Sequence, residues 1–340
     1  MNAGDDREAR PGTDAPGTDV SGTDASEAAA PRPRSTRRRI VLRLIQAGIV
    51  AATVYFLAAY LARSWAGIKD FDWTFDAGWL ALSGVAFLAY YFAQAGFWCL
   101  LLWGCGAASP FWPAASVWGK SVLARYVPGN VFMFVGRAWM SHARGLPVER
   151  VSAAMVYEQA IGVCSALLTV AVLFPFWQYR PGLTAVSLLA IPVLIVLMHP
   201  RVFRPLAGRA LRMLHRPPLE VTLGFGLVLL VTGLFMLDWF VAGAAAWLLG
   251  RAVAGLAVSA LPLVIVAYAL AYVAGMVEFF FPSGIGVREA VLTASLSKEL
   301  PGGVALTWAL LLRLWVTAME LVFVGLVVGI EALVRRRNPA

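Results

Sequence analysis

Long uninterrupted runs of hydrophobic residues dominate the pattern along this chain. Since a helix rises 1.5 Å per residue, about 20 apolar residues cross the hydrocarbon core of a bilayer. The pattern therefore predicts an all-α polytopic membrane protein with seven clear spans. The apolar runs lie at about 40–61, 77–103, 151–174, 182–199, 221–249, 256–281 and 303–331.

The first 35 residues differ from the rest, because they are rich in Gly, Asp, Thr, Ala and Pro. Such a segment buries too little apolar surface to offset the entropy of ordering, so we expect 1–35 to be a disordered tail. A transmembrane domain is expected over 36–335 and a short basic tail over 336–340. The run after Arg37-Arg38-Arg39 is longer than a signal peptide's apolar region, which favours an uncleaved first span over a signal peptide.

Lysine and arginine set the expected orientation, because cytoplasmic loops of membrane proteins carry an excess of them. Arginines precede the run at 40–61, occupy 201–216 and close the chain at 335–337, so both termini are predicted to be cytoplasmic. An even number of crossings is then required. We predict about eight, with the eighth at 283–300, and expect the segment 112–136 to dip into the membrane and return.

Composition strengthens this picture and removes one alternative. The chain is 60% hydrophobic and 14% charged, whereas soluble domains carry about 25% charged residues. The net charge of +9 lies in clusters beside apolar runs, so it favours the positive-inside pattern over nucleic-acid binding. The three cysteines have no metal-binding spacing and are expected to be small buried hydrophobic residues.

Two segments interrupt the apolar runs in a similar way, each with Pro and Gly followed by Arg. Proline ends a helix and restricts the residue before it, and glycine permits a turn. In membrane proteins, a pair of such segments indicates a transporter's binding site. The first segment contains Arg125, Tyr126, Pro128, Gly129 and Asn130, followed by Arg137, and the second contains Pro282, Ser283, Gly284, Gly286, Arg288 and Glu289.

These breaks are also places where an anion could bind. Asn130 and Ser283 can cap the helices that follow, and a helix N-terminus carries amide donors and partial positive charge. Arg125, Arg137 and Arg288 would add full charges. We therefore predict two broken or re-entrant half-helices that bind a lipid phosphate, with packing kinks and interfacial turns as the alternative.

Ionisable residues inside the predicted spans are the other candidates. A charge at the membrane centre costs about 2.5–3.5 kcal/mol on insertion scales, so such residues usually pair or line a polar cavity. Arg313 and Glu320 stand two helical turns apart, too far for a direct pair, so each would pair with another helix. An intramembrane polar path and a set of structural interhelical pairs are both open, with Glu158, Asp238, Glu278, Arg313 and Glu320 as members.

The sequence contains no recognisable catalytic motif. No Walker loop, nucleophile elbow or metal-ligand spacing occurs, and the three histidines lie at the ends of spans or in loops. We expect neither an enzyme nor a bound cofactor or metal.

The two broken segments resemble a known family. Ser121-x-x-Ala124-Arg125-Tyr126-Val127-Pro128-Gly129 with Arg137 and Arg144-Gly145-x-Pro147, and the block from Phe281 to Ala290, are similar to the lysylphosphatidylglycerol synthase transmembrane region family. This flippase-like family includes the flippase half of the bacterial multiple peptide resistance factor. The resemblance covers about residues 40–332.

The resemblance implies a protein of the bacterial cytoplasmic (inner) membrane that handles lipids. The expected function is translocation of an anionic, aminoacylated or polyprenyl-linked lipid head group through a polar cleft, with membrane lipids as partners. Aminoacyl transfer is not implied, because that chemistry belongs to a separate soluble domain of the two-part factors. A non-transporting subunit that presents lipid to a lipid-modifying enzyme, such as a glycosyltransferase, is the alternative.

Overall fold

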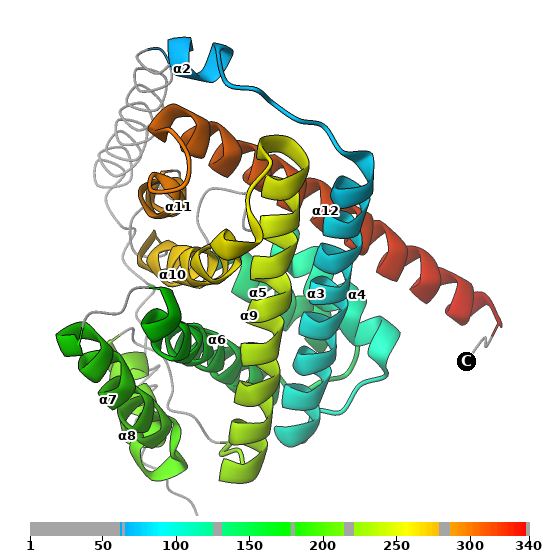
Figure 1. Cartoon of the computed structure of the whole chain (residues 1–340). Coiled ribbons are helices and arrows are strands. Elements are labelled where there is room, and N and C mark those ends of the chain that lie inside the picture. Colours follow the sequence, from blue (N-terminus) through cyan, green and yellow to red (C-terminus); the bar gives the residue numbers. More distant parts are fainter. Residues whose placement is uncertain are drawn as a thin grey trace, which may run out of the picture. The chain divides into compact units, whose positions relative to one another are not determined.

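The computed structural model describes residues 62, 65–124, 131–177, 181–213, 221–278 and 286–337, and within them it contains helices and no strand (Figure 1). The all-helical prediction is confirmed for this part of the chain. The predicted tail at 1–35 and the predicted span at 40–61 lie outside the described residues. The first described helix is the short α2 (Trp65–Lys69).

Five described helices are long and apolar enough to cross a membrane. A sixth span results if α7 (Pro181–Met198) and α8 (Pro200–Met213), which are bent by 77° relative to each other, form one broken span. These positions match six of the predicted apolar runs. The five are α3 (Ala77–Gly104), α6 (Val148–Trp177), α9 (Phe225–Ala254), α10 (Leu261–Glu278) with the preceding η2 (Val258–Ala260), and α12 (Gly302–Arg337).

Short helices occupy the interrupted segments. The predicted crossing at 283–300 contains α11 (Val287–Leu296), whose ten residues span about 15 Å, half of a hydrocarbon core. The prediction of about eight crossings is therefore not confirmed. In the segment expected to dip into the membrane and return, α4 (Phe111–Leu123) and α5 (Val131–His142) are similarly short and pack against each other.

The long and short helices recur in one order. Helices α3, α4, α5 and α6 form a first set, and α9, α10, α11 and α12 form a second, each with its break before the third helix. Packing between the sets is reciprocal, because α6 contacts α10 and α9 while α12 contacts α4 and α3. We interpret this shared helix order and reciprocal packing as an internal repeat, with α7 and α8 inserted between its halves.

The first helices of the two sets, α3 and α9, run in opposite directions. Hydrogen bonds join Asp76 N to the carbonyl of Ala252 (3.1 Å) and Ser83 Oγ to that of Ala245 (2.7 Å). Further along, Gln94 Nε2 donates to Asp238 (2.8 Å). Successive residues of α3 thus contact earlier and earlier residues of α9, so the two helices are antiparallel, as Figure 1 also shows. The repeat is therefore inverted, the arrangement found in many secondary transporters.

A glycine permits a close approach of the α9 and α10 backbones. A Cβ at Gly243 of α9 would lie 2.5 Å from the backbone Cα of Ile265 in α10. Small residues let membrane helices approach closely, where dispersion contacts replace the hydrophobic effect. Gly243 therefore sets the distance between α9 and α10 in the second half of the repeat.

Replacing Gly243 with alanine should destabilise the protein by about 1–3 kcal/mol, because backbone rather than a flexible side chain must move. Gly233→Ala on the same helix is the matched control, since no heavy atom lies within 4 Å of its Cβ position. Thermal unfolding in detergent, followed by the loss of helical circular dichroism, measures both. Equal melting temperatures for the two variants would contradict this role of Gly243.

Candidate functional site

The described residues include part of the predicted site. Arg137, Gly286, Arg288, Glu289 and the path residues Glu158, Asp238, Arg313 and Glu320 are among them. Glu278 ends α10, but its side chain falls outside the described part, as do Arg125, Tyr126, Pro128, Gly129, Asn130, Pro282, Ser283 and Gly284.

An ion pair joins the first half-helix to the long helix that follows it. Arg137 of α5 binds the Oε2 atom of Glu158 in α6, and both residues are buried, with 1% and 6% exposure. The second carboxylate oxygen accepts a hydrogen bond from Trp118 Nε1 at 2.7 Å. Arg137 Nε donates to Ser121 Oγ at 2.8 Å.

Aromatic rings complete the surroundings of Arg137. Its guanidinium lies 4.7 Å from the ring centroid of Trp98 in α3 and 5.9 Å from that of Trp118 in α4. Charge pairing, hydrogen bonding and cation–π contact together offset the desolvation of a buried guanidinium. In this conformation, Arg137 therefore holds four helices together and has no open face for a lipid phosphate.

A second ion pair joins the second half-helix, α11, to the long helix that follows it, but the acidic and basic partners are exchanged. Here the half-helix supplies the acid, since Glu289 of α11 binds Arg313 Nη1 of α12 at 2.5 Å. Glu289 is 2% exposed, whereas the Arg313 side chain is 38% exposed. The expectation that Arg313 pairs with another helix is confirmed. Because more than a third of its side chain is exposed, Arg313 is accessible to a further anion.

Glu289 also changes the expected chemistry of the half-helix terminus. Gly286, with a φ of 121°, forms the turn into α11 in a conformation that favours glycine. Its backbone N–H donates to Glu289 Oε2 at 3.0 Å. This first-turn carboxylate therefore satisfies an amide that we had expected to be available to a lipid phosphate.

Arg288 lies one residue earlier on the same half-helix. Its guanidinium is 5.0 Å from the ring centroid of Tyr268 in α10, and the side chain is half-buried. Arg288 and Arg313 thus bring two cationic groups to the helices around the second break. Of the predicted anion-binding arginines that the structure describes, Arg288 is the one with an accessible side chain.

Two further path residues, Asp238 and Glu320, are buried. Asp238 of α9 is 4% exposed and accepts the hydrogen bond from Gln94 of α3. Glu320 of α12 is 1% exposed. Glu158, Asp238 and Arg313 thus each make an interhelical contact. No sequence pattern indicated the contacting residues Gln94, Trp98, Trp118 and Tyr268. Ser121 differs, because it stands in the first segment that resembles the family.

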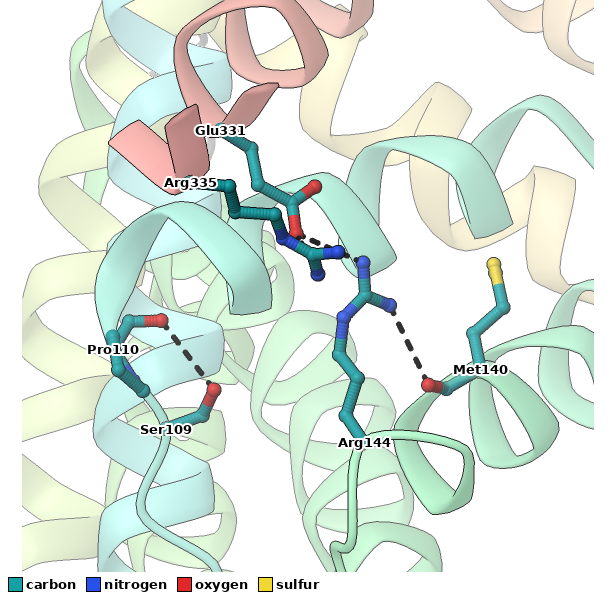
Figure 2. A network of polar contacts seen from close by, with 6 residues as sticks. All are labelled: Ser109, Pro110, Met140, Arg144, Glu331 and Arg335. Atoms are coloured by element: carbon teal, nitrogen blue, oxygen red, sulfur yellow. Dashed lines mark hydrogen bonds and ion pairs between the residues drawn. The ribbon is translucent and has the colours of Figure 1, made fainter. Parts of the chain in front are cut away.

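A further charged cluster lies where the α5–α6 turn meets the end of α12. Figure 2 shows Glu331 between two arginines, with hydrogen bonds from Arg144 (3.1 Å) and Arg335 (2.7 Å). Arg144 also donates to the carbonyl of Met140 at 3.4 Å. The contact brings Arg144 and Arg335 to the same end of the helices, as expected if both lie on one side of the membrane.

One hollow of the described surface is apolar. It is a groove of about 380 Å³ between α6 and α7, lined by residues that include Leu167, Phe174, Leu183 and Leu194. Such a lining suits a hydrocarbon chain rather than a charged head group. Within the described ranges, no group of three or more His, Cys, Asp or Glu residues could hold a metal ion.

No protein-family model, curated protein or solved structure matches this chain.

Removing one partner of the Arg137–Glu158 pair should cost about 3–5 kcal/mol of stability, because the other charge is left buried. We expect this loss for Glu158→Gln, measured by thermal or denaturant unfolding in detergent. Glu299→Gln, which alters an exposed carboxylate, is the control and should change stability by less than about 0.5 kcal/mol. The double variant Arg137→Leu/Glu158→Leu should lose less than the sum of the single Arg137→Leu and Glu158→Leu effects. Strict additivity would contradict a direct pair.

Proposed function

We propose that this chain is a flippase-like membrane protein that translocates the head group of an anionic, aminoacylated or polyprenyl-linked lipid. The observation that carries the proposal is that two arginines at α11 and α12 keep part of their side chains exposed. Arg313 is 38% exposed although it binds Glu289, and Arg288 is half-buried against Tyr268. Arg313 lies inside the candidate span α12. A charged side chain there is costly, and such residues commonly serve a substrate pathway.

Guanidinium groups are well suited to a lipid phosphate. Their planar array of N–H donors matches phosphate oxygens, and a charge-assisted hydrogen bond is about twice as strong as a neutral one. In the proposed mechanism, Arg288 and Arg313 hold the phosphate beside α11 while the acyl chains remain in the hydrocarbon. Glu289 balances the charge of Arg313 when no lipid is bound.

The inverted repeat supports transport rather than simple binding. In transporters of this architecture, the site lies between the repeats, and one repeat moves against the other around it. The two halves differ here, because the Arg137–Glu158 pair is buried and the Glu289–Arg313 pair is partly exposed. We propose that the α5–α6 connection stays fixed while the α10–α11–α12 region admits the head group.

The family resemblance leads to the same proposal. We infer membership of the lysylphosphatidylglycerol synthase transmembrane region family and a location in the bacterial inner membrane with both termini cytoplasmic. Arg125 and its neighbours at the first break would contact the lipid from the other half of the repeat. The chain would act on lipids without chemical change to them.

Translocation of fluorescent phosphatidylglycerol in proteoliposomes tests the function. The purified full chain should speed the loss of fluorescence when a membrane-impermeant reductant is added. Arg288→Gln should slow translocation by at least about tenfold, because it removes charge-assisted hydrogen bonds of about 1.5–3 kcal/mol. Arg313→Gln/Glu289→Gln should do the same without leaving an uncompensated charge.

The control is Arg336→Gln/Arg337→Gln, which removes charge from an exposed end of α12 and should translocate lipid at the wild-type rate. Wild-type rates in the Arg288 and Arg313 variants would eliminate this site. If the folded wild-type chain binds phosphatidylglycerol but moves none, translocation is wrong and a subunit that presents lipid to a partner enzyme is the better explanation.

A further inference from the structure

Helix α8 has a charge pattern unlike that of the long helices. It contains Arg201, Arg204, Arg209 and Arg212, all exposed, and no acidic residue. It begins directly after the apolar helix α7, from which it is bent by 77°. If α7 alone crosses the bilayer, rather than α7 and α8 together as one broken span, a bend of this size directs α8 along the membrane surface.

Three sides of α8 have different chemistry. At 3.6 residues per turn, the four arginines fall within an arc of about 140°. A second side, with Phe203, Ala207 and Leu211, packs against the hydrophobic core. Leu206 and Met213 lie within about 20° of each other beside the arginine arc, and they are 44% and 82% exposed.

Contacts with neighbouring helices fix the position of α8. The Phe203 ring packs 5.0 Å from the ring of Tyr157 in α6, centroid to centroid. Tyr157 also accepts a hydrogen bond from the backbone N–H of Leu223, just before α9, at 3.3 Å. Nearby, Arg150 of α6 binds the carbonyl of Gly106 after α3. The helix therefore lies against the end of the bundle where α3 ends and α6 and α9 begin.

The exposed sides fit a bilayer surface better than water. Exposed leucine and methionine beside an arginine face are typical of helices that lie in the plane of the interface. Their apolar side chains enter the acyl boundary while basic residues contact head groups, and anionic lipids strengthen this binding. An acidic protein surface would satisfy the arginines, but it would not explain why the apolar side adjoins a membrane span.

We propose that α8 is an interfacial helix that binds anionic phospholipid. The arginines contact lipid phosphates, and Leu206 and Met213 insert among the acyl chains. This surface is separate from the half-helices, since it shares no residue with α5 or α11. The proposal for α8 can therefore be tested independently of lipid translocation.

An environment-sensitive fluorophore attached at single cysteines tests the insertion. The full-length Met213→Cys and Leu206→Cys variants are made in a background in which Cys99, Cys105 and Cys164 are replaced by alanine. They are labelled and reconstituted in phosphatidylcholine vesicles with or without phosphatidylglycerol. Both probes should show a blue-shifted emission and quenching by lipid-attached bromine, more strongly with phosphatidylglycerol. A probe at Arg209→Cys, on the arginine side, should have a more water-like emission.

Charge-matched variants test the role of the arginines. In the Met213→Cys background, Arg209→Gln/Arg212→Gln should abolish the additional blue shift caused by phosphatidylglycerol. Arg336→Gln/Arg337→Gln removes the same charge from α12 and should leave the shift unchanged. The unlabelled Arg209/Arg212 variant should also retain less phosphatidylglycerol through purification, measured by native mass spectrometry, than wild type or the control.

Three results would overturn the proposal. The first is a water-like emission at both Met213 and Leu206 in both kinds of vesicle. The second is an equal loss of the lipid-dependent shift in the two charge-matched variants. The third is a blue shift in native membranes that is absent from vesicles of purified lipid, which would identify a protein as the partner of α8.

Discussion

The hydrocarbon core of a membrane offers no hydrogen bonds, and the arrangement of these helices follows from that constraint. Backbone groups freed by a break, and any charged side chain, must find partners within the protein. Arg137 meets this requirement through Glu158, Ser121 and two tryptophan rings. Arg313 meets it through Glu289, which also accepts a hydrogen bond from the turn before α11. In each half of the repeat, an ion pair thus joins the half-helix to the following long helix.

The two ion pairs differ in a way that bears on function. Arg137 is enclosed by four helices, so movement of α5 would break a buried network and leave a charge without its partner. The Arg313 side chain stays partly exposed, so a lipid phosphate could approach it while the bond to Glu289 remains. The same helix order therefore contains one buried ion pair and one that is partly exposed.

Much of the helical architecture is predictable from the sequence, because each long apolar run requires burial in lipid or protein. The crossing at 283–300 is predicted from the even number of crossings that two cytoplasmic termini require. Such a count cannot distinguish a crossing from a half-helix, and α11 has only ten residues. Arg313 was correctly expected to pair with another helix, but Glu289 could not be identified as its partner, since they lie 24 residues apart. Gln94 and Trp98 belong to the site through the packing of α3, and no local motif indicates them.

The central claim is that a lipid phosphate binds between Arg288 and Arg313 at the second break. The most direct measurement is an experimental structure of the full chain in a lipid nanodisc that contains phosphatidylglycerol. We expect density for a lipid phosphate within hydrogen-bonding distance of both guanidinium groups, and its loss in Arg288→Gln. A well-resolved α11 with lipid density confined to the outer surface of the helices, and none near Arg313, would contradict the claim.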